Sequence, residues 1–130
     1  MENKLNKNGL YDVRIWHGTR SMIIIKAELI EVELYDHSSE KLVFIVQDTF
    51  GNQFKISDCW LKHNSGDNVV KGLWFNHKLK NDRSFIFNDS AIAMTLSHYN
   101  CESIGEIIGK EVEVFPNEKN FFALVSCNMN

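Results

Sequence analysis

The stretch that decides the fold is residues 84–127, SFIFNDSAIAMTLSHYNCESIGEIIGKEVEVFPNEKNFFALVSC. Asp89 and Ser90 offer an N-cap, and the apolar residues that follow repeat at spacings of four and three, which predicts a helix over 91–100. A short helical turn follows and ends at Gly109, a typical C-cap residue. The alternating run KEVEVF and the final FFALVSC, joined by the turn PNEKN, then predict a closing hairpin.

The residues before this stretch are rich in strand signals. The long β-branched run at 21–36 changes the phase of its alternation once, which predicts a β-bulge within one long strand. The alternative is two shorter strands with a kink between them. KLVFIVQD (41–48) and QFKISDC (53–59) read as two further strands separated by the hairpin signal FGN, and residues 10–16 alternate as another half-buried strand.

A β-meander, a helix and a final hairpin therefore follow one another along the chain. This order predicts a mainly β fold with one main helix, an OB-like five-stranded barrel with an insertion between its third strand and the helix. A length of 130 residues predicts one domain over 1–130, with the polar residues 1–9 disordered and residues 60–88 as the insertion. The apolar fraction of 44% is sufficient for a packed core.

The same stretches resemble phage-encoded OB-fold single-stranded-DNA-binding proteins, over residues 21–127. The resemblance rests on the long strand KAELIEVEL, the hairpin KLVFIVQDTFGNQFKISDCWL, the helix-bearing segment and the closing IIGKEVEV. It implies a non-enzymatic single-stranded-DNA-binding protein of phage or mobile-element type. The chain departs from the pattern in two ways, because it ends in CNMN without a strongly acidic tail and because residues 60–83 exceed what a minimal barrel needs.

Basic and aromatic residues gather in the middle of the chain. The whole chain carries a net charge of −3, yet residues 71–83 carry +3, from four Lys and Arg against one Asp, and residues 102–119 carry −3, from five Glu against two Lys. Single strands of nucleic acid are held by cationic grooves and by rings that stack on bases. We therefore predict a DNA-binding groove formed by Lys55, Trp60, Lys62, Lys71, Trp74, Lys78, Lys80 and Arg83. The alternative is that the tryptophans belong to the core and the lysines to a solvated rim.

Other arrangements of reactive residues are weaker. The pairs Cys59-x3-His63 and His98-x2-Cys101 have the residue types of a zinc site, but neither has the usual CxxC spacing, so no metal is predicted. Neighbours in one turn, such as DHS at 36–38, do not supply the geometry of a hydrolytic triad. No phosphate-binding or dinucleotide glycine motif occurs. The sequence therefore predicts neither enzymatic activity nor a cofactor.

A second hypothesis for function belongs to a different class. The chain is then a protein-binding module, for example a phage-encoded inhibitor of a host defence complex, whose acidic segment 102–119 opposes a basic partner protein. The sequence also predicts a cytoplasmic protein, in the host cytoplasm if it is phage-encoded. It has three cysteines without a CxxC motif, a polar N-terminus and no apolar run of membrane-spanning length. The sequence leaves the oligomeric state open.

Overall fold

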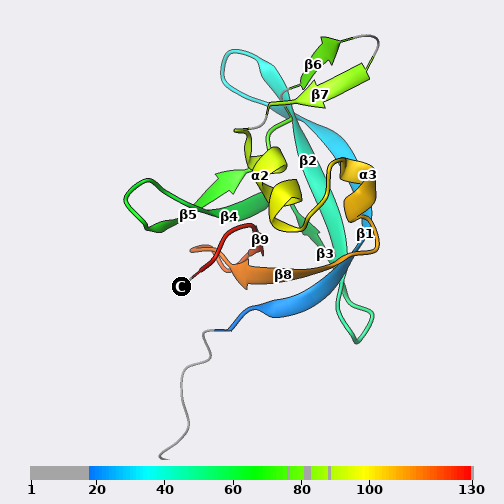
Figure 1. Cartoon of the computed structure of the whole chain (residues 1–130), viewed down its shortest axis with the longest axis vertical. Helices are drawn as coiled ribbons and strands as arrows, with labels where there is room; N and C mark the ends of the chain where they lie inside the picture. The colour runs from blue at the N-terminus through cyan, green and yellow to red at the C-terminus, as the bar shows by residue number, and fades with distance from the viewer. Residues whose placement is uncertain (1–17, 76, 81–82, 88, 130) are drawn as a thin grey trace, which may run out of the picture.

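A computed structural model of the chain describes residues 18–75, 77–80, 83–87 and 89–129, and over 77–80 and 83–85 it describes the course of the backbone. The N-terminal residues 1–9 and the strand predicted at 10–16 lie outside the described residues. The protein is mainly β, as predicted (Figure 1). Its elements are β1 (Arg20–Glu33), β2 (Ser38–Gln47), β3 (Gln53–Ile56), β4 (Asp58–Lys62), β5 (Asn68–Gly72), β6 (His77–Lys80), β7 (Arg83–Ile86), α2 (Ala91–His98), α3 (Ile104–Ile107), β8 (Glu111–Pro116) and β9 (Phe122–Val125).

Strand β1 is the long strand that the sequence predicts, and its register against β2 shifts between Ile24 and Lys26. Ile24 is fully buried opposite Val46, and Ile25 is exposed. After the bulge, Ala27 lies opposite the buried Phe44. The strand therefore contains a β-bulge, but not where the sequence placed its change of phase, between Leu29 and Ile30. The register there is unbroken, and both side chains are exposed. The run of isoleucines hides the position of the bulge in the sequence because apolar residues occupy both faces of the strand there.

Seven strands form one sheet in the order β3-β2-β1-β8-β9-β4-β5, in which β4 and β9 are parallel and the other neighbours antiparallel. Strands β6 and β7 form a separate two-stranded ribbon that projects from the upper end of the molecule in Figure 1. Hydrogen bonds between the described residues do not close the large sheet. The sheet curls back on itself, however. The ring of Phe54 on β3 meets the ring of Phe122 on β9 edge-on, with centroids 5.1 Å apart, although three strands separate β3 from β9 in the sheet order.

The third predicted strand, at 53–59, divides at Ser57 into β3 and β4. The physical reason is a change of the inward phase, because Ile56 and Cys59 are both fully buried although they are three residues apart. The predicted insertion at 60–88 therefore begins later than expected, since its first residues complete β4. The rest of it forms β5 and the β6–β7 ribbon.

Helix α2 closes one side of the core that the curled sheet surrounds. The Ser90 hydroxyl accepts a hydrogen bond from the Ala93 N–H at 3.1 Å, which is the N-cap that the sequence predicts. Ile92 and Leu96 of the helix are buried against the sheet. After the helix, the Tyr99 hydroxyl donates to the carbonyl of Val125 on β9 and accepts from the backbone N–H of Glu113 on β8. No helix in the described part of the chain is long and apolar enough to cross a membrane.

Candidate nucleic-acid interface

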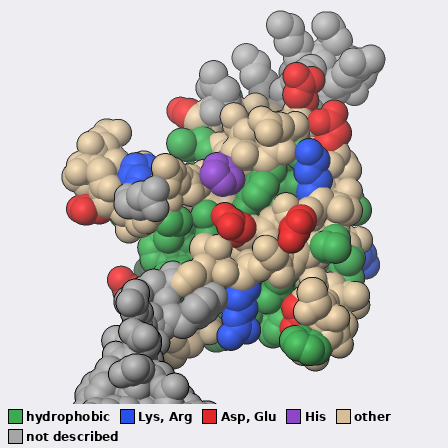
Figure 2. Space-filling view, turned by 60° about the horizontal axis from the view of Figure 1, so that its bottom comes forward, with side chains coloured by type: hydrophobic (Ala, Val, Ile, Leu, Met, Phe, Trp, Pro, Cys, Tyr) green, Lys and Arg blue, Asp and Glu red, His purple; other side chains and the backbone are tan. Residues whose placement is uncertain are grey.

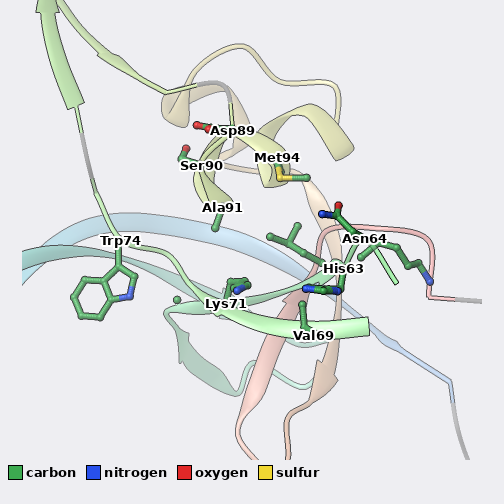
Figure 3. A pocket seen from close by; sticks show the side chains of 12 residues that line it. His63, Asn64, Val69, Lys71, Trp74, Asp89, Ser90, Ala91 and Met94 are labelled. Atoms are coloured by element: carbon green, nitrogen blue, oxygen red, sulfur yellow. The ribbon is translucent and has the colours of Figure 1, made fainter. Parts of the chain in front are cut away.

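A cleft of about 500 Å³ lies between the β4–β5 hairpin and the start of α2 (Figure 3). We call it the helix cleft. Three of the eight predicted DNA-binding residues line it: Lys62 from β4, Lys71 from β5 and Trp74, which follows β5. Asp89 also lines it, so these charged side chains give the cleft a net charge of +1 with histidine neutral. The structure thus brings together residues that come from separate elements.

The β4–β5 hairpin holds the lysines at this cleft. Lys71 lies opposite Cys59 in the antiparallel register, whereas Lys62 lies opposite Asn68 at the other end of the hairpin. A tight turn joins the two strands, in which the backbone N–H of Gly66 donates to the carbonyl of His63 at 2.8 Å. Gly66 has a φ of 93°, a left-handed conformation that glycine adopts without strain. His63, at the start of this turn, also lines the helix cleft. The sequence offered no reason to count it among the DNA-binding residues.

The indole of Trp74 is held by its neighbours on one side. The Lys41 ammonium lies 5.1 Å from the centroid of the indole and forms an ion pair with Asp58 at 2.9 Å. A β-bridge joins Lys41 and Trp74, and the absence of a side chain at Gly72 leaves room for the indole. Trp74 is partly buried and lines the helix cleft. Its contacts with Lys41 and Gly72 restrict the movement of the indole.

Trp60 lies in a different cleft, of about 630 Å³, between the β4–β5 hairpin and the turn at 117–121. We call it the turn cleft. The indole N–H of Trp60 donates to the carbonyl of Phe115 at 3.1 Å, and the two rings meet edge-on. Phe121 and Lys119 also line this cleft, and Phe121 is 68% exposed. Sequence reasoning missed this exposed ring, although its place beside a polar turn was a signal.

The β6–β7 ribbon carries three more of the predicted residues. Its register pairs Lys78 with Phe85 and Lys80 with Arg83. Paired residues of an antiparallel ribbon share a face, and positions two residues apart share it as well. These four positions therefore belong to one face of the ribbon, three of them cationic and one aromatic. We call it the basic face; the sequence alone did not single out Phe85.

The eight predicted residues do not converge in a single groove. Lys62, Lys71 and Trp74 share the helix cleft, Trp60 lies in the turn cleft, and Lys55 is exposed on β3 and lines neither. The other three occupy the basic face of the ribbon. Both tryptophans are partly buried, which is intermediate between the core and the stacking interpretations.

The cysteines and histidines considered for zinc lie in unlike surroundings. Cys59 is fully buried, whereas His63 is exposed in the turn after β4. Burial raises the pKa of the Cys59 thiol to about 11, although hydrogen bonds with Thr95 and Ser126 oppose the shift. Within the part of the chain that the structure describes, no group of three or more His, Cys, Asp and Glu side chains is placed to hold a metal ion.

Comparison of the chain with protein-family models, with curated proteins and with solved structures finds no match.

Proposed function

We propose that the chain binds single-stranded DNA, without catalysing a reaction, along the helix cleft and the basic face of the β6–β7 ribbon. The observation that carries this proposal is that cationic and aromatic positions recur along the segment from Lys62 to Phe85. Lys62, Lys71 and Trp74 line the helix cleft, and the ribbon begins at His77, three residues after Trp74 along the chain. The positions on the basic face add three cationic residues and Phe85.

The proposed architecture is an OB-like barrel. If β3 and β4 are counted as one strand bent at Ser57, this strand pairs with β2 at one end and with β9 at the other. β9 pairs with β8, β8 with β1, and β1 with β2, which returns to the bent strand. A five-stranded, partly open barrel of this kind commonly binds oligonucleotides. The resemblance to phage-encoded single-stranded-DNA-binding proteins favours the same assignment.

The chemistry of the proposed tract suits a flexible single strand. Lysine and arginine neutralise phosphates without reading sequence. Stacking of a base on an aromatic ring contributes about 1–3 kcal/mol, and it tolerates any base. Because Lys41 and Gly72 already hold Trp74 in place, stacking on this ring costs little side-chain entropy. We therefore expect binding that depends steeply on salt and weakly on sequence.

Fluorescence titration with an oligo-dT strand at low salt tests the proposal. We expect tryptophan quenching that high salt reverses. Trp74→Phe should lose most of the quenching, and Trp60→Phe, the matched control in the turn cleft, should keep it. Absence of binding to the oligonucleotide at low salt would refute the proposed function.

A second candidate function is the protein-binding module, because all five glutamates of the segment 102–119 are exposed. On the face turned forward in Figure 2, acidic side chains lie beside hydrophobic ones. Such a surface suits a basic partner protein. Recovery of one stoichiometric protein partner after nuclease treatment would favour this function. Retention on single-stranded-DNA resin, lost at high salt, would favour the first.

A further inference from the structure

Strand β1 has an open edge along its second half. β8 pairs with β1 only at Arg20–Ile23, and Ile24 makes the last backbone hydrogen bonds on that side, with Gly109 and Lys110. From Lys26 to Glu33, β1 pairs with β2 along its other edge. No strand among the described residues pairs with the remaining edge of this segment. An edge of this kind presents backbone N–H and C=O groups that another extended chain can pair with.

Exposed apolar side chains alternate with charged ones along this open edge. Ile25, Leu29 and Ile30 are 38%, 42% and 41% exposed. Proteins ordinarily protect exposed edges with lysine, proline or a bulge. Here the bulge lies at the start of the segment, between Ile24 and Lys26, and the segment from Lys26 to Glu33 holds one lysine and no proline. Charge is therefore what protects this edge, and a strand of the opposite charge can still pair with it.

The charge of the segment Lys26–Glu33 indicates which kind of strand pairs with this edge. The segment carries Lys26 against Glu28, Glu31 and Glu33, a net charge of −2. Lys26 already lies 3.5 Å from Glu28. Glu31 accepts a hydrogen bond from the Ser38 hydroxyl at 2.9 Å, but both Glu31 and Glu33 are exposed and can meet the cations of a partner. A second copy of the chain would bring the same charge of −2 to the edge, and like charges opposite one another destabilise a sheet.

We propose that the open edge of β1 binds an extended segment of a partner protein in which apolar residues alternate with Lys or Arg. The added strand bonds to the β1 backbone, its apolar side chains pack beside Ile30 on one face of the sheet, and its cations meet Glu31 and Glu33 on the other face. This site lies outside the helix cleft and the ribbon, so it goes beyond DNA binding and does not depend on it.

The test uses the full chain and the synthetic peptide acetyl-KVKVKVKV-amide, followed by amide signals in NMR and by calorimetry. We expect the peptide to shift the amide signals of residues 26–33. The variant Glu31→Lys/Glu33→Lys should weaken peptide binding by roughly tenfold or more, because two cross-strand charge pairs become repulsive. The variant Glu102→Lys/Glu118→Lys, with the same change of charge at other exposed positions, should bind the peptide like the unmodified chain.

Several outcomes would overturn this proposal. One is equal affinity for a peptide N-methylated at alternate residues, because methylation removes the backbone donors that an added strand needs. Others are signal shifts confined to residues 102–119, or sedimentation that shows the chain pairing with itself through β1. In each case binding of oligo-dT by Glu31→Lys/Glu33→Lys is measured in parallel, and unchanged DNA binding shows that the two proposals stand or fall separately.

Discussion

Replacing Lys62 and Lys71 by glutamine should flatten the salt dependence of DNA binding while leaving the fold intact. Both residues line the helix cleft, and the proposed tract contains five cations: Lys62, Lys71, Lys78, Lys80 and Arg83. Each phosphate neutralised on a single strand contributes about 0.7 to the slope of log K against log salt concentration. Five contacts therefore give a slope of about −3.5, and the three that remain in the variant give about −2.1.

These slopes translate into a large difference in affinity. Between about 50 and 200 mM salt, binding should weaken by about 130-fold for the unmodified chain and by about 20-fold for the variant. Fluorescence anisotropy of a labelled oligo-dT over a salt series measures both slopes. The matched control is Lys26→Gln/Lys110→Gln, which removes the same charge outside both clefts. Equal slopes for the unmodified chain and the Lys62/Lys71 variant, or equal flattening in the control, would refute the reasoning.

Three further predictions concern the fold. A methyl group at Gly72 would lie 2.7 Å from Nε1 of Trp74, so Gly72→Ala should lower the free energy of unfolding by about 1–3 kcal/mol, and an unchanged melting temperature would contradict this. Burial raises the pKa of Cys59 from 9.0 to about 11 and that of Tyr99 from 10.0 to about 12. Because the unfolded chain loses these protons first, the free energy of unfolding should hold up to about pH 9 and fall towards pH 12, which urea titrations at several pH values measure; a flat profile would count against it. Ellman's reagent should modify the partly exposed Cys127 before the buried Cys59, and simultaneous reaction would show that the core opens easily.

Much of the architecture was predictable from the sequence because its signals are local. The cap at Ser90 and the apolar spacing after it specify α2 within a few residues of chain. The long first strand was predictable for the same reason, but its bulge lies between Ile24 and Lys26, within a run of isoleucines that shows no alternation, and not at the phase slip. The third strand divides at Ser57 because Ile56 and Cys59, three residues apart, are both buried. The sequence did not predict this division, because the burial of these two residues depends on strands far away in the chain.

The candidate site shows where local reasoning ends. Composition identified a basic and aromatic tract, yet it did not predict that Trp60 and Trp74 would line different clefts. Those positions depend on contacts between residues far apart in the chain, Trp60 with Phe115 and Trp74 with Lys41.

By itself, the sequence determined the mainly β fold, the long first strand and the capped helix, because periodicity and capping act between near neighbours. Only the tertiary structure decided which cations share a cleft, which face of the ribbon carries them, and which stretch of β1 is left with an open edge. The reason is that pairing across a sheet, and the burial that follows from it, depend on segments that the linear order does not place together.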